Sequence, residues 1–363
     1  MNPRGAGKLS IVSLESKRII DFNGVLMVAE KLAGYGYYAD KISRVAFNES
    51  EEIVSALSDC ADNYENSVII CPASMGATVC QFFTEKCGGE FDGLGILNTN
   101  GKAIFILYSD CANRLEFKDI KALLDKKYGI CYDSAVIKCV GAPVKLIDGA
   151  ISNAQKRFGD GVSFNVKESF DDFRIEIVYT SLVPKIKLDE TVREIVKTLG
   201  EYVYALEDIS LAEQLYRLLK LRRMNISVAE SFTGGGVGKR LVEVSGVSEV
   251  YFEGLNTYSN EAKMQRLGVS ELTLSQRGAV SAETAYQMAE GLLKTGNCDI
   301  AVSTTGIAGP KSDNTLKPVG LAYIGVGVEG DIAVYKFNFA GDRQAISEKA
   351  INHALFLAYK RLK

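Results

Sequence analysis

The chain has 363 residues, 47% of them hydrophobic, and this length favours two or three globular domains over a single core. With 42 Lys and Arg residues against 45 Asp and Glu, there is no excess of positive charge, so nucleic acid is not expected as a partner. No stretch approaches the roughly 18 apolar residues that span a bilayer, and no export signal is evident, so we expect a cytoplasmic protein without a membrane partner.

Residues 1–147 alternate helical and extended segments, which is typical of an α/β fold. A helix is expected over 24–32, and strands over 67–71 and 103–107. Residues 148–204 instead predict a small α+β module. Its expected elements are a short helix, strands over 163–166 and 174–179, and a helix over 190–198.

A third unit is expected over 205–363. Ser210 and Glu213 have the spacing of a capping box before a helix over 211–223. The elements expected after it are a strand over 225–229, a helix from 237, a strand over 253–258, a helix from 261, a helix over 282–294, a strand over 299–304, two strands up to 339 and a final helix. Strands that alternate with helical crossovers predict a layered α/β sheet.

Cysteine and histidine usage restricts the chemistry. The eight cysteines show neither C-x-x-C pairs nor a dense disulfide pattern, so we expect reduced thiols, no metal and no cofactor. The only histidine, His353, lies on the apolar-leaning final helix and is expected to be a helix residue rather than a catalytic base. Acid-base chemistry would therefore rely on Lys, Tyr, Asp or Glu.

The segment AESFTGGG, residues 229–236, lies where a strand is followed by a helix. Ligands bind beyond the C-terminal ends of strands in open α/β sheets, and glycine lets the backbone approach them closely. Ser231 would be a nucleophile, and the amides around Thr233, Gly234 and Gly235 would bind a phosphate or an oxyanion. The alternative is that Ser231 or Thr233 only caps the helix.

Two further loops are expected at the same edge of the sheet. Residues 257–263 contain Tyr258, Asn260 and Lys263, and residues 304–310 form a polar, glycine-containing loop. A lysine in the first turn of a helix is not explained by the helix dipole, which favours acids there. Lys263 would take part in proton transfer, unless its amine simply extends to solvent.

The segments AESFTGG, TYSNEAK, LGV, GAVS, TGIAGP and KPVG resemble, in this order, the C-terminal domain of the CinA family, the nicotinamide mononucleotide deamidases. The resemblance covers about residues 205–363. It implies an amidohydrolase that converts nicotinamide mononucleotide to nicotinate mononucleotide and ammonia. Ser231 would attack the carboxamide, while Lys263 and Tyr258 would manage its proton. The implied partner is a small nucleotide, and family likeness suggests a homodimer. The implied substrate-binding residues are Glu230, Thr233, Gly234, Gly235, Asn260, Thr305, Gly306, Gly309 and Arg343.

The sequence departs from the family pattern in this domain. Phe232 stands where the family has Cys, which should leave the neighbouring hydroxyl of Ser231 available. Residues 309–314 replace a G-P-x-G-G loop, which alters the expected substrate lid. Ser347 stands where many members have Arg, so one anion contact is expected to be lost.

Residues 148–204 are similar to the KH-like linker of full-length CinA proteins, and residues 1–147 to their molybdopterin-cofactor-binding-type (MoCF) domain. Residues 21–23 and 48–52 stand where that domain has its N-T-N and G-D-N-E-like segments. Residues 71–78 replace its T-G-G-L-G-P-T-x-D-D signature, without the glycine pair or the acidic pair. We therefore expect a degenerate MoCF-like domain.

Two other functions stay open at this point. One is a non-catalytic nucleotide-binding sensor or scaffold, which the altered lid and Ser347 favour and the intact Ser231, Tyr258 and Lys263 disfavour. The other is a residual ADP-ribose pyrophosphatase in the N-terminal domain, which the missing acidic pair disfavours.

Overall fold

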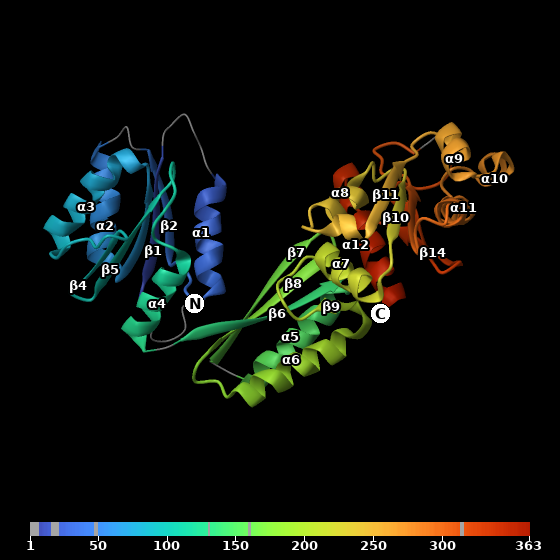
Figure 1. Ribbon diagram of the computed structural model, residues 1–363. Coiled ribbons are helices and arrows are strands. Elements are labelled where there is room, and N and C mark those ends of the chain that lie inside the picture. Colours follow the sequence, from blue (N-terminus) through green and yellow to red (C-terminus); the bar gives the residue numbers. More distant parts are fainter. Residues whose placement is uncertain (1–6, 16–21, 47–49, 130, 159–160, 313–315) are drawn as a thin grey trace. The chain divides into compact units, whose positions relative to one another are not determined.

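The computed structural model describes residues 7–15, 22–46, 50–129, 131–158, 161–312 and 316–363 (Figure 1). The chain divides into two compact units. The N-terminal unit comprises residues 1–135, 153–165 and 176–191, and the C-terminal unit comprises 136–152, 166–175 and 192–363. Segments from the middle of the chain thus contribute to both units, and the domain boundaries after 147 and 204 stay predictions. Among the described residues, no helix is long and apolar enough to cross a membrane.

The described residues of the N-terminal unit include a five-stranded sheet of order β2-β1-β3-β5-β4. Its strands are β1 (Leu9–Glu15), β2 (Lys41–Ala46), β3 (Asn66–Cys71), β4 (Ile96–Thr99) and β5 (Lys102–Tyr108). All neighbours pair in parallel except β4, which is antiparallel to β5. The helices that connect them are α1 (Phe22–Gly34), α2 (Ser50–Asn63), α3 (Ala73–Cys87) and α4 (Phe117–Tyr128).

Each face of this sheet is covered by two helices (Figure 1). On one face, Val28 of α1 and Ile120 of α4 pack against strand residues such as Phe105. On the other, Leu57 of α2 and Phe83 of α3 pack against residues such as Ile104. Because alternate strand residues point to opposite faces, a continuous apolar strand supplies both cores. This arrangement confirms the α/β fold class for the N-terminal unit.

Residues 71–78, which replace the phosphate-binding signature, do not form an extended glycine loop. Helix α3 begins at Ala73, directly after Pro72. The Ala73 amide donates to the carboxylate of Asp110 at 2.8 Å. A side-chain carboxylate therefore already occupies an anion position at this helix start. Of the other segments compared with the MoCF domain, Asp21, Asn48 and Glu49 lie outside the described residues, and Ser50 begins α2.

The middle of the chain forms a sheet whose order in the described residues is β7-β8-β6-β9. Its elements are β6 (Tyr132–Val140), α5 (Val144–Phe158), β7 (Val162–Ser169), β8 (Asp172–Thr180), α6 (Lys185–Leu199), a 3-10 turn (Gly200–Tyr202) and β9 (Val203–Ala205). The predicted strands and helices of this segment are present, each longer than expected. The KH-like assignment stays a prediction.

The described residues of the C-terminal unit contain a second five-stranded sheet, of order β11-β10-β12-β13-β14. Strands β11, β10 and β12 are parallel, and β13 and β14 are antiparallel additions. The strands are β10 (Ile226–Glu230), β11 (Tyr251–Asn256), β12 (Ile300–Gly306), β13 (Leu321–Val328) and β14 (Asp331–Asn338). The helices are α7 (Leu211–Arg222), α8 (Gly236–Val242), a 3-10 turn (Val247–Glu249), α9 (Asn260–Leu267), α10 (Glu271–Gln276), α11 (Ala282–Leu293) and α12 (Arg343–Leu362).

This second sheet is also sandwiched between helices (Figure 1). Leu215 of α7 and Leu355 of α12 belong to the core on one face, with Val228 of the sheet. Met288 of α11 and Leu267 of α9 belong to the core on the other. The layered α/β architecture predicted for 205–363 is therefore confirmed. The expected cap is present, since the Ser210 hydroxyl accepts from the Glu213 amide at 3.1 Å.

His353 is packed, as expected for a residue on the final helix. Its ring lies 4.8 Å from that of Phe337 and 5.2 Å from that of Phe339, measured between centroids. Its Nε2 atom lies 3.3 Å from the carboxylate of Asp171. The neighbouring Asn352 donates to the carbonyl of Phe170 at 2.9 Å. Helix α12 thus holds the turn between β7 and β8, and His353 has a structural role there.

Candidate active site

Ser231 occupies the turn between β10 and α8. The strand ends at Glu230, and the helix begins at Gly236. Gly234 and Gly235 have φ angles of 64° and 95°, in the left-handed region that side chains rarely adopt. A Cβ atom on either residue would meet nothing within 4 Å, so the loop faces open space there. The two glycines allow the tight turn that places Ser231 at the end of a buried strand.

The Glu230 carboxylate points back into its own loop rather than toward that open space. It accepts hydrogen bonds from the amides of Gly235, Val237 and Gly238 at 2.9 to 3.1 Å. Only 2% of Glu230 is exposed. The carboxylate therefore satisfies the first amides of α8 and fixes the loop that carries Ser231.

The loop amides divide into two groups. Those of Gly234 and Gly235, which the sequence predicts as ligands for a phosphate or oxyanion, already donate to the Ser231 carbonyl and the Glu230 carboxylate. Those of Phe232 and Thr233 have no acceptor among the described residues. Amides directly after a nucleophile are a common source of an oxyanion hole.

Lys263 is the principal partner of Ser231. It lies in α9, whose N-cap is Ser259. Its Nζ atom is 3.1 Å from the Ser231 Oγ atom, and it also donates to the carbonyls of Thr257 at 2.8 Å and Tyr258 at 3.1 Å. Only 1% of Lys263 is exposed, which excludes the alternative that its amine extends to solvent.

Burial lowers the pKa of Lys263 to about 8. A neutral amine has two N–H donors and one lone pair. The carbonyls of Thr257 and Tyr258 can take the two N–H groups, which leaves the lone pair for the hydroxyl proton of Ser231. The surroundings of this amine therefore suit a base that accepts a proton from Ser231.

The side chain of Phe232, which replaces the family's Cys, is buried. It belongs to an apolar cluster with Ala308, Phe339 and Ile346. A Cβ atom at Gly306 would lie 2.9 Å from the Phe232 ring, so the absence of a side chain at Gly306 makes room for it. The larger residue is therefore accommodated in the core.

Arg343 connects two of the predicted loops. As the first residue of α12, it donates from Nη1 to the carbonyl of Gly309 at 2.7 Å and from Nη2 to the hydroxyl of Tyr258 at 3.4 Å. Tyr258 is 64% exposed and Arg343 is also exposed. The guanidinium is thus held beside the loop that orients Lys263 while remaining accessible to an anion.

The remaining predicted residues support the site or lie at its border. The hydroxyls of Thr233 and Thr304 share a buried hydrogen bond of 2.7 Å. Thr305 and Gly306 lie within β12, which extends beyond the predicted end at residue 304. Asn260 is exposed at the start of α9, and no hydrogen bond joins its side chain to another described residue.

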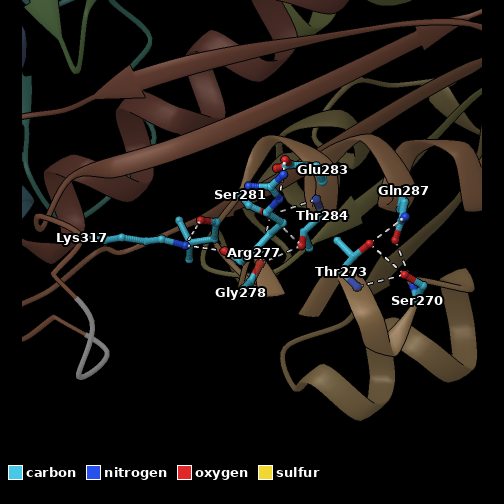
Figure 2. Close-up of polar contacts among 10 residues, drawn as sticks. Ser270, Thr273, Arg277, Gly278, Ser281, Glu283, Thr284, Gln287 and Lys317 are labelled. Carbon is cyan, nitrogen blue, oxygen red and sulfur yellow. Dashed lines mark hydrogen bonds and ion pairs between the residues drawn. The ribbon is translucent and has the colours of Figure 1, made fainter. Parts of the chain in front are cut away.

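A polar cluster joins Lys317 to the segment between α10 and α11 (Figure 2). Lys317 donates to the carbonyls of Arg277 at 2.8 Å and Val280 at 2.7 Å. Within the same segment, the carbonyl of Ala279 accepts from the Thr305 hydroxyl at 2.7 Å. The quoted segments GAVS and KPVG are therefore in direct contact. Of the altered lid, residues 313–315 lie outside the described residues.

Several contacts could not be assigned from residue types alone. The carbonyl of Thr257 and the hydroxyl of Thr304 were not predicted as site groups, although both lie in or beside quoted motifs. Within the described ranges, no group of three or more His, Cys, Asp or Glu side chains could hold a metal ion.

Comparisons with known proteins find relatives for part of this chain. A family model described as the CinA C-terminal domain matches residues 208–362. A CinA-like protein of Kosmotoga olearia is 49% identical over 163 residues, which cover 45% of this chain and 40% of that protein. A protein of Caldicellulosiruptor saccharolyticus, named as competence-damage inducible, is 47% identical over 180 residues, which cover 50% of this chain and 44% of its own length.

The chain thus spans less than half of the length of these curated relatives. Among solved structures, a CinA superfamily protein from Klebsiella pneumoniae is 30% identical, with a TM-score of 0.41. The match covers 42% of this chain and 95% of that one. The family model thus identifies residues 208–362 as a CinA C-terminal domain.

Proposed function

We propose that this protein is an amidohydrolase that converts nicotinamide mononucleotide and water to nicotinate mononucleotide and ammonia. The observation that carries the proposal is the buried contact of 3.1 Å between Lys263 Nζ and Ser231 Oγ. A serine and a lysine with a lowered pKa form a nucleophile and base pair without histidine. The amide substrate follows from the family resemblance of the motifs that hold both residues.

In the first half of the reaction, neutral Lys263 takes the proton of Ser231 as its Oγ atom attacks the carboxamide carbon. The tetrahedral oxyanion is stabilised by the amides of Phe232 and Thr233. The C–N bond then breaks, and Lys263 returns the proton to the departing nitrogen, which leaves as ammonia. The product of this half is an ester between Ser231 and the nicotinoyl group.

In the second half, a water molecule gives a proton to Lys263 and attacks the ester. Collapse of the second oxyanion returns that proton to Ser231 Oγ and releases the carboxylic acid, which ionises in solution. The main-chain carbonyl of Tyr258 accepts a hydrogen bond from the Lys263 amine and orients it. The hydroxyl of Tyr258 accepts a hydrogen bond from Arg343. Arg343 would bind the 5′-phosphate of the substrate.

Trapping of the ester tests this assignment. Full-length protein is mixed with nicotinamide mononucleotide, and the reaction is quenched in acid within the first turnovers. The protein is then digested, and the mass of the peptide containing Ser231 is measured by mass spectrometry. A mass increase equal to the acyl group of nicotinate mononucleotide is expected on Ser231. Product formation by a Ser231→Ala variant at the wild-type rate would contradict the proposal.

A further inference from the structure

A cavity in the N-terminal unit lies at the carboxyl ends of β3 and β5. It has a volume of about 570 Å³, and Ile70 of β3 and Leu107 of β5 line its inner side. Met27 of α1 and Phe117 of α4 line its walls. Ligand pockets have volumes of about 300 to 1,000 Å³, and in open α/β sheets they lie beyond the carboxyl ends of strands. Size and position both match a small-molecule site.

The lining is apolar at the base and aromatic at the sides. Ile70 and Leu107 are buried, at 7% and 5% exposure, whereas Met27 is 49% exposed although it borders the cavity. Tyr108 and Phe117 add ring surface. The loop after β5 is held in shape, because the Asn113 side chain accepts from the Tyr108 amide and donates to its carbonyl. The cavity is therefore preformed and suited to a ring compound.

The charged groups at the rim favour a single negative charge. Glu116 and Lys118 form an ion pair of 2.7 Å and offset each other. Lys31 also lines the cavity, is exposed, and has no ion pair with any other described residue. The rim therefore offers one ammonium group without an ion-pair partner among the described residues, which suits a single anionic group on an otherwise apolar ligand.

This cavity is separate from the helix start that would bind a polyphosphate. That position, at Ala73, is already capped by Asp110. It belongs to α3, which covers the opposite face of the sheet from α1 and α4. We propose that the N-terminal unit binds a small, flat, mostly apolar ring compound with one anionic group, in the cavity between α1 and α4, with Lys31 as its cationic contact.

The test uses the full chain and a matched pair of fluorescent probes. The anionic probe is 1-anilinonaphthalene-8-sulfonate, and the neutral probe is N-phenyl-1-naphthylamine, which lacks the sulfonate. Lys31→Glu should lower the affinity for the anionic probe by about tenfold or more and leave the affinity for the neutral probe nearly unchanged. Lys126→Glu is the control, because Lys126 is an exposed residue of α4 that does not line the cavity.

A second pair of variants tests the location. Met27→Trp fills the cavity from an exposed helix position and should abolish the binding of both probes to this unit. Leu26→Trp is its control, since Leu26 is 56% exposed on the same helix and does not line the cavity. Thermal melting checks that all variants fold. Equal binding by the Met27→Trp and Leu26→Trp variants would overturn the site, and equal effects of Lys31→Glu and Lys126→Glu would overturn the anionic contact.

Discussion

Lys263 and Ser231, 32 residues apart in sequence, are joined by a buried contact of 3.1 Å between Nζ and Oγ. The contact exists because parallel strands β10 and β11 deliver their following loops to the same edge of the sheet. Desolvation of the ammonium group is offset in part by the two carbonyls of Thr257 and Tyr258. Such a costly arrangement of a lysine is typical of functional sites.

The first prediction concerns the identity of the amine. Lys263→Met keeps the apolar stem but cannot exchange a proton, so turnover of nicotinamide mononucleotide should fall by on the order of a hundredfold or more. Lys263→Arg should be similarly impaired, because guanidinium stays protonated. The control is Lys239→Met, since Lys239 is exposed on α8. Steady-state turnover is measured for each variant, and thermal melting checks that each variant folds. Near-normal turnover by Lys263→Arg would refute the proton-transfer role of Lys263.

The second prediction follows from the pKa of Lys263, which burial lowers to about 8. The base is active when neutral, so turnover should rise with pH and reach half its maximum near pH 8. Stability should change in the same direction. Because the folded-state pKa is below the unfolded value of about 10.4, the burial penalty is full below pH 8 and is lost as pH rises toward 10.4.

The effect of pH on stability is measured as the difference in free energy of unfolding between the wild type and Lys263→Met. The gap in free energy of unfolding between wild type and Lys263→Met should shift in favour of the wild type between about pH 8 and pH 10, since other titrating groups cancel. A turnover profile that is flat from pH 6 to 9 would show that Lys263 does not act as the base.

The third prediction assigns Glu230 a positioning role. Glu230→Gln loses one acceptor for the amides of Gly235, Val237 and Gly238 and places an N–H donor against them. We expect turnover to fall about ten- to a hundredfold and stability to fall by about 1 to 3 kcal/mol, with KM little changed. Glu243→Gln, an exposed position just after α8, is the control. A rise in KM alone would instead indicate direct binding of the substrate by Glu230.

The fourth prediction concerns phosphate recognition by Arg343. Arg343→Ala should raise KM for nicotinamide mononucleotide by about ten- to a hundredfold with a small change in kcat, because a charge-assisted contact is lost. The KM for nicotinamide riboside, which lacks the phosphate, should rise much less. Arg266→Ala, an exposed arginine of α9, serves as the control. An equal loss with both substrates would argue against a phosphate contact.

Much of the C-terminal fold could be predicted because its elements are bounded by strong local signals. The caps Ser210 and Ser281 mark where α7 and α11 begin. The short α10 was not predicted, and β12 continues two residues beyond the expected end. Both depend on packing with neighbours, which local pattern does not encode.

The site was predictable in its residue types and less so in their orientations. Ser231, Tyr258 and Lys263 stood out because hydroxyls and amines followed strands, and the family resemblance joined them. The inward turn of the Glu230 carboxylate could not be foreseen, since an acid beside a glycine loop suits a ligand equally well. Its partners are amides of its own loop, and their direction is set only once α8 packs on the sheet.

The most direct test of the central claim is ammonia release from nicotinamide mononucleotide by the full chain with a chelator present. Equal amounts of ammonia and nicotinate mononucleotide are expected from the wild type. Ammonia release by Ser231→Ala should be lower by about a thousandfold or more, because the nucleophile is removed. No ammonia from folded wild-type protein, or equal release by Ser231→Ala, would contradict the account.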